Sequence, residues 1–249
     1  MSQAFPLELL LAMMTTARPW HGGSPGKAAP QVGQAFIESV PTDVVKYELD
    51  KSSGHLRIDR TQNYSSHCPT LYGFVPQTYC GTETGQYCAL KSGQQIEDGD
   101  GDPLDICVLT ECNITHGNIF VNAVPIGGLR MIDGGKADDK IIAVLQNDVV
   151  YGNIKNALRT TKGVQGLIKR LKHYFLSYKR DPDGGSDKQV EIAAVYGRQE
   201  AFEVIARSRR DYLANFGDPR ERLELLRRMV SSFCSPGQAG STAKKSAKS

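Results

Sequence analysis

Residues 97–109 read Glu97-Asp98-Gly99-Asp100-Gly101-Asp102-Pro103-Leu104-Asp105-Ile106-Cys107-Val108-Leu109. Five carboxylates fall within the first nine of these residues, and an apolar run typical of a buried strand follows at once. Carboxylates at this density repel one another unless cations lie among them, and their oxygens favour hard divalent ions such as Mg²⁺, Mn²⁺ or Ca²⁺. Because the glycines and the proline also fix the backbone, we interpret the stretch as a metal-binding loop rather than a solvated turn.

An EF-hand calcium loop is the first alternative, because Asp98, Asp100 and Asp102 would fill its first, third and fifth positions. The sixth position needs a glycine for a sharp turn but holds Pro103. The twelfth needs a bidentate glutamate but holds Leu109. The pattern therefore excludes an EF-hand.

A second acidic stretch, Asp133-Gly134-Gly135-Lys136-Ala137-Asp138-Asp139-Lys140, also leads into an apolar strand. Taken alone, this second stretch is more typical of a solvated acidic turn beside a surface lysine. Two such loops at the ends of neighbouring strands could, however, meet in space and hold several metal ions. Four cations suited to phosphate oxygens are interleaved with them along the chain: Lys46, Arg60, Lys140 and Lys179. Phosphoryl transfer needs both kinds of group, because metals activate water and cations neutralise an anionic substrate.

The composition is that of an ordinary globular protein. Of 249 residues, 40% are hydrophobic and 23% charged, which excludes collagen, coiled coil and wholesale disorder. The formal charge is +3, but Lys244, Lys245 and Lys248 lie in the last six residues, so the remainder has 27 basic (30 minus 3) and 27 acidic side chains. This balance argues against a nucleic-acid partner bound through bulk phosphate neutralisation.

Neither a membrane partner nor an exported protein is expected. The apolar run Leu9–Met14 is too short for a bilayer span and lacks the basic lead of a signal peptide, so a cytoplasmic location is the default. Without a secretion signal or a CxxC pair, reduced thiols are expected rather than disulfides or a zinc site. The six cysteines are Cys68, Cys80, Cys88, Cys107, Cys112 and Cys234.

Alternation and turn residues predict a hairpin of strands over 43–50 and 55–60, followed by short strands over 104–109, 119–126, 140–145 and 190–196. Apolar residues three and four apart predict helices over 164–179 and 199–216, and Asp218-Pro219 predicts the start of a third. The fold class is therefore α+β, a small strand-rich barrel with helices packed on it.

Three segments are expected. Residues 1–33 read as an irregular N-terminal arm, packed through Trp20, and residues 235–249 as a disordered basic C-terminal tail. Residues 34–234 form the single domain between them.

The ordered motifs resemble those of a known family. The run Asp100–Asp105 resembles the signature of the soluble inorganic pyrophosphatases of the Mg²⁺-dependent barrel family, family I. The other motifs follow in family order over roughly residues 34–217: Glu38 before a proline, Lys46-Tyr47-Glu48, Asp59-Arg60, Tyr72-Gly73, Asp133, Asp138-Asp139-Lys140 and Tyr178-Lys179.

The resemblance implies a five-stranded OB-like β-barrel with flanking α-helices, and a role for each matched residue. Asp102 would be the general base. The metal ligands would be Asp100, Asp105, Asp133 and Asp138, with Glu38 and Glu48 as outer carboxylates. The phosphate-binding residues would be Lys46, Arg60, Tyr72, Lys140, Tyr178 and Lys179.

The activity implied is Mg²⁺-dependent hydrolysis of inorganic diphosphate to two phosphates, by direct attack of metal-activated water and without a covalent phosphoenzyme. Several Mg²⁺ ions are expected, with Mn²⁺ or Zn²⁺ as substitutes and Ca²⁺ as an inhibitor. Relatives form dimers or hexamers, so a homo-oligomer is expected.

Spacing distinguishes the neighbouring acids. The family ligand lies two residues before the lysine, which selects Asp138 and leaves Asp139 a supporting role. Asp98 precedes the signature and is expected to be supporting or solvated. Tyr178 also continues the apolar stripe of its helix, so only its place in the Tyr178-Lys179 pair marks it as functional.

Two departures from the family pattern stand out. Cys68-Pro69 replaces a Tyr-Pro pair four residues before the Tyr-Gly step, which removes a secondary donor and predicts a quantitative effect at most, with added sensitivity to oxidation. The stretch 77–97 is longer than in compact relatives and is predicted to be a surface loop.

Two other functions remain open. One is hydrolysis of a larger diphosphate or a polyphosphate, if residues 77–97 reshape the mouth of the site. The other is a binding module that senses metal or phosphate and acts through its arm and tail. Retention of Asp102 argues against the second, since a pure binder needs no base.

Overall fold

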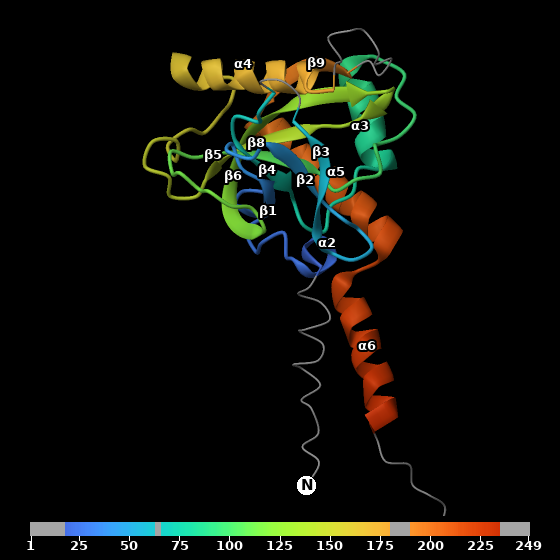
Figure 1. Ribbon diagram of the computed structural model, residues 1–249. Helices are drawn as coiled ribbons and strands as arrows, with labels where there is room; N and C mark the ends of the chain where they lie inside the picture. Colours follow the sequence, from blue (N-terminus) through green and yellow to red (C-terminus); the bar gives the residue numbers. More distant parts are fainter. Residues whose placement is uncertain (1–17, 63–65, 180–189, 235–249) are drawn as a thin grey trace, which may run out of the picture.

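The computed structural model describes residues 18–62, 66–179 and 190–234 (Figure 1). Five strands pair in a closed ring in the order β1, β4, β5, β8, β6 and back to β1, and only the β5–β8 pair is parallel. The predicted α+β fold, with a five-stranded OB-like barrel and flanking helices, is confirmed. The ring strands are β1 (Gly33–Ser39), β4 (Leu71–Phe74), β5 (Asp105–Leu109), β6 (Ile119–Asp133) and β8 (Lys140–Leu145).

Three further pairings complete the strands. β7 (Lys136–Ala137) and β9 (Val190–Gly197) both pair with β6. β2 (Val45–Leu49) and β3 (Leu56–Thr61) form a separate antiparallel hairpin, as the alternation predicts.

β6 is much longer than the predicted strand over 119–126. The sequence Gly127-Gly128 resembles a turn, but both glycines lie within the strand, just after a bulge. A Cβ on Gly128 would lie 2.4 Å from Cζ of Tyr196 on β9, so the glycines permit a close approach of two strands rather than ending one.

Helices cover the ring on two sides. α4 (Lys162–Ser177) buries its predicted apolar stripe, including Val164, Ile168 and Leu171, against the sheet. α5 (Arg198–Phe216) packs on β6 and buries Val204 and Ile205 in a hydrophobic cluster separate from the one beneath α4. With both sides covered, the parallel strands β5 and β8 are almost entirely apolar and buried.

The arm, as far as the structure describes it, is anchored through Trp20, as expected. It contains a short helix, α2 (Pro19–Gly22), and Trp20 is buried, with its Nε1 donating to the Thr78 carbonyl at 2.8 Å. The basic tail over 235–249 lies outside the described residues.

The prediction of a surface loop over 77–97 is wrong, because residues Thr82–Ser92 form α3, which buries Tyr87 and Cys88. The start of α3 is capped by a residue that is distant in sequence. Asp211 of α5 accepts from the backbone N–H groups of Gly81, Glu83 and Thr84 at 3.1, 2.9 and 3.0 Å. No residue next to α3 in sequence supplies this cap.

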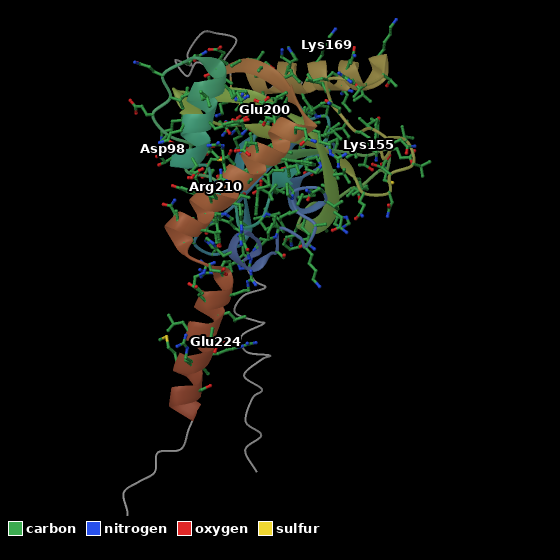
Figure 2. The ribbon with its side chains drawn as sticks, turned by 180° about the vertical axis from the view of Figure 1, so that it is seen from behind. Asp98, Lys155, Lys169, Glu200, Arg210 and Glu224 are labelled. Atoms are coloured by element: carbon green, nitrogen blue, oxygen red, sulfur yellow. The ribbon has the colours of Figure 1, made fainter. Side chains whose placement is uncertain are left out.

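α6 (Pro219–Cys234) begins at the predicted proline, and Asp218 Oδ1 accepts from the Arg220 backbone N–H at 2.8 Å. It projects away from the ring, as both views show (Figures 1 and 2). Within the described ranges, no helix is long and apolar enough to cross a bilayer.

Replacing Asp211 by alanine should destabilise the protein by about 2–4 kcal/mol, because three backbone donors at the start of α3 lose a buried, charged acceptor. Urea denaturation measures this loss. Asp218→Ala, which removes an exposed cap, is the matched control and should cost about 1 kcal/mol or less. Equal losses for the two variants would contradict the role given to Asp211.

Stability should also fall on acidification because of His21. Burial, helped by Arg222 and Arg18, lowers the pKa of His21 from 6.5 to about 4, and its Nδ1 lies 2.8 Å from the Tyr212 hydroxyl. Between these pKa values the unfolded chain binds the proton and the folded chain does not, so stability decreases as pH falls from 6.5 to 4.

Because His21 is only partly buried, solvent screening limits this decrease to about 1 kcal/mol. Denaturation midpoints of the wild type and of His21→Gln across this pH range provide the test. The variant should show the smaller decrease, and parallel curves would refute the assignment.

Candidate active site

One cavity of about 420 Å³ lies between the β2–β3 hairpin, the ends of β5 and β8, and the end of α4. Every residue that the sequence predicts for the site lines it, so the structure brings the whole predicted set together. These residues are Glu38, Lys46, Glu48, Arg60, Tyr72, Asp100, Asp102, Asp105, Asp133, Asp138, Lys140, Tyr178 and Lys179.

The signature loop is held by its glycines. Gly101 has φ +82°, a left-handed conformation that favours glycine, and its N–H donates to the Cys80 carbonyl at 2.9 Å. A Cβ on Gly99 would lie 2.2 Å from the same carbonyl oxygen. The backbone N–H of Asp102 donates to Asp100 Oδ1 at 3.0 Å. The loop is therefore packed tightly and presents its carboxylates to the cavity.

At the centre of the cavity, Lys140 lies between two carboxylates. Parallel pairing sets Asp105 of β5 opposite Lys140 of β8, and the Lys140 ammonium donates to both Asp105 and Asp138. Strand alternation turns Asp138 and Lys140 toward the cavity and Asp139 away from it. Asp139 instead lies 3.7 Å from Arg130 Nη2.

Tyr72 reaches the same centre from β4. Its hydroxyl donates to Asp105 Oδ2 at 2.7 Å. The next residue must be glycine, because a Cβ on Gly73 would lie 1.8 Å from the Phe36 carbonyl oxygen of β1. Burial, followed by the charge of Asp105, raises the pKa of Tyr72 well above its ordinary value, so the phenol stays a neutral donor.

The cations of the protein do not fully neutralise the negative charge of the cavity carboxylates. Burial and the nearby charge of Asp138 raise the pKa of Asp100 to about 9, and burial and Asp105 raise that of Glu38 to about 8. Asp133 Oδ1 is buried without a hydrogen-bond partner among the described residues. Hard divalent cations would satisfy these oxygens, so the donor set fits Mg²⁺.

The hairpin supplies cations from one side. Lys46 and Arg60 face each other in the β2–β3 register. Lys46 Nζ lies 3.4 Å from Glu48 and 3.2 Å from Asp59, and Arg60 Nη2 lies 2.8 Å from Asp59. Asp59 therefore links the two cations and holds them at the cavity wall.

The end of α4 supplies a second group. Lys179 contacts Asp133, and the Arg60 guanidinium lies 5.5 Å from the ring centroid of Tyr178. Tyr178 also packs against the core cluster beneath α4. Tyr178 therefore both continues the apolar stripe of α4 and lines the cavity. The sequence alone did not decide between these two roles.

Sequence reasoning missed several lining residues. Lys51 forms an ion pair with Asp102, although its sequence context shows only a polar hairpin turn. Lys136 lies in the second acidic loop, where it looks like a surface lysine. The remaining lining residues are Leu49, Phe74, Pro103 and Gly134.

The two departures lie outside the cavity. Cys68 is buried in the core cluster with Tyr72, and its Sγ lies 3.7 Å from Thr70 Oγ1. None of residues 77–97 lines the cavity. They pack instead against the outer side of the signature loop, where a Cβ on Gly85 of α3 would lie 2.7 Å from the carbonyl carbon of Asp98.

Outside the cavity, Glu111, Cys112 and Asp148 form a separate cluster of potential metal ligands. Asp148 accepts from the Thr110 hydroxyl and from the N–H groups of Val150 and Tyr151, so its oxygens serve to fold these turns. This group is explained as local structure.

Comparison with known proteins agrees with the geometry. A family model described as inorganic pyrophosphatase matches residues 35–213. Inorganic pyrophosphatases of Chlamydia caviae and Chlamydia trachomatis are 47% and 46% identical to the chain, covering 82% and 80% of it and 94% and 95% of their own lengths. The crystal structure of an inorganic pyrophosphatase from Thermus thermophilus matches with a TM-score of 0.60 at 27% identity, covering 76% of this chain and 95% of that one. The chain therefore belongs to the inorganic pyrophosphatase family.

Proposed function

We propose that the protein hydrolyses inorganic diphosphate to two phosphates in a reaction that depends on Mg²⁺. The observation that carries this proposal is the centre of the cavity, where Asp100, Asp105 and Asp138 converge around Lys140. Family membership and the uncompensated carboxylates support it.

The metal ions would be held by Asp100, Asp105, Asp133 and Asp138, with Glu38 and Glu48 as outer carboxylates. Bound divalent ions supply two effects in such chemistry: they lower the pKa of water and neutralise phosphate oxygens. The raised pKa values of Asp100 and Glu38 support this assignment, since both carboxyls gain from a nearby positive charge.

The substrate would be held by cations and neutral donors from different elements around the cavity. Lys46 and Arg60 belong to the hairpin, and Lys179 follows the end of α4. Tyr72, Tyr178 and Lys140 complete the phosphate-binding set. Charge-assisted hydrogen bonds from these cations would orient the two phosphoryl groups and stabilise the leaving phosphate.

Asp102 would act as the general base. Its side chain is 44% exposed, against 19% for Asp105 and 9% for Asp138, so it is the more accessible to water. Water attacks one phosphorus, its proton passes to Asp102, and the bridging P–O bond breaks to release the second phosphate. Lys51, paired with Asp102, would orient the carboxylate.

The remaining expectations complete the proposal. Mn²⁺ or Zn²⁺ would substitute for Mg²⁺, and Ca²⁺ would inhibit. The catalytic domain would span 34–234, and the enzyme would be a cytoplasmic homo-oligomer without nucleic-acid or membrane partners. The balanced charge and the family resemblance support these assignments.

Asp102→Asn should lower kcat for diphosphate by about 10²- to 10⁴-fold, because the amide cannot accept the proton. Phosphate release measured with Mg²⁺, with Ca²⁺ and with chelator tests this. Of these three conditions, only the one with Mg²⁺ should give activity in the wild type. Asp98→Asn, which changes a neighbouring acid outside the cavity, should keep activity within about twofold of the wild type.

A folded wild type that binds diphosphate with Mg²⁺ but leaves it intact would contradict the proposal and favour a binding module. Full activity in Asp102→Asn would reject only the general base.

A further inference from the structure

A second cavity, of about 310 Å³, lies on the outer side of α4, next to the segment that precedes β4. This volume is at the lower end of the range for small-molecule sites, about 300–1,000 Å³. It shares no lining residue with the catalytic cavity. The lining residues are Ser66, His67, Pro69, Lys169, Arg170, His173, Tyr174 and Ser177.

The walls of this second cavity are basic. Lys169 and Arg170 lie on exposed positions of α4, and Figure 2 labels Lys169 at the edge of the body. Neither forms an ion pair with any residue in the described ranges. No lining residue is acidic, and the sequence has no Asp or Glu from 149 to 179. The local potential therefore favours an anion.

The cavity also contains a hydroxyl donor. Tyr174 is only 6% exposed as a whole and lines the cavity, and its hydroxyl has no hydrogen-bond partner among the residues that the structure describes. This hydroxyl is not among the buried polar atoms that lack a partner, so solvent reaches it and it is free to donate to a ligand in the cavity. Burial raises the pKa of Tyr174, which keeps the hydroxyl protonated.

We propose that this cavity binds a small phosphate-bearing anion at a site separate from the catalytic cavity. Lys169 and Arg170 supply the positive charge, and the Tyr174 hydroxyl donates a hydrogen bond to a phosphate oxygen. A tetrahedral anion with several acceptor oxygens uses all three groups at once, which a monovalent halide cannot.

The site adjoins the catalytic cavity through aromatic packing. The rings of Tyr174 and Tyr178 are stacked with centroids 5.0 Å apart and an interplanar angle of 26°. Tyr174 lines the second cavity and Tyr178 the catalytic one. An anion held by Tyr174 therefore lies behind the tyrosine that faces the substrate.

Isothermal titration calorimetry of the full chain in EDTA tests the proposal with three probes: inorganic phosphate, diphosphate and adenosine 5′-monophosphate. The three distinguish a free phosphate, a longer phosphate and a nucleotide as sources of the phosphoryl group. The double variant Lys169→Gln with Arg170→Gln should weaken binding of the best probe at least tenfold. Tyr174→Phe should weaken it by about 3- to 10-fold.

The matched control is Arg159→Gln with Lys162→Gln, which removes the same two kinds of charge at exposed positions that do not line the cavity. Binding to this control should stay within twofold of the wild type. Binding of no probe to the wild type, or equal binding to all variants, would overturn the proposal. Equal weakening in the control would overturn it too, by showing a diffuse charge effect.

Hydrolysis of diphosphate, measured separately with Mg²⁺, should persist in the double variant, because Lys169 and Arg170 lie outside the catalytic cavity. Loss of anion binding with retained hydrolysis therefore supports a separate site. Loss of both would overturn the separation of the two cavities.

Discussion

Lys140 is buried between Asp105 and Asp138, and the rest of the cavity is arranged around this contact. A buried ammonium is stable only when carboxylates surround it, and the single parallel pairing of the ring sets Asp105 opposite Lys140. Antiparallel neighbours then bring Tyr72 to Asp105 from the other edge. The ring is thus a scaffold that holds one network of charged side chains at the ends of its strands.

The same network creates a constraint that the protein alone does not satisfy. One lysine cannot compensate all of the carboxylates, and burial raises the pKa of Asp100 to about 9 and that of Glu38 to about 8. Such a site is costly to fold without cations and gains stability when they bind. Metal affinity and folding stability should therefore be coupled.

The local sequence predicts much of this structure, because three of the ring strands (β5, β6 and β8), α4 and the Asp100–Asp105 loop carry periodic or dense chemical signals. The other two ring strands, β1 and β4, were not predicted. Two further kinds of feature escape the sequence. α3 depends on a cap from Asp211, which lies in another helix and leaves no mark beside Thr82–Ser92. Lys51 faces Asp102 only because the β2–β3 hairpin folds over the cavity, a contact that no local pattern encodes.

The most direct test of the central claim is the free energy of unfolding of the wild type and Asp100→Asn at pH 7, in EDTA and in Mg²⁺. Since burial and Asp138 raise the pKa of Asp100 to about 9, the metal-free protein must protonate this carboxylate when it folds at pH 7, which opposes folding, so asparagine should stabilise the metal-free protein by about 1–3 kcal/mol. Mg²⁺ should then stabilise the wild type more than the variant. A variant that is less stable in EDTA, together with equal stabilisation of both proteins by Mg²⁺, would contradict the account.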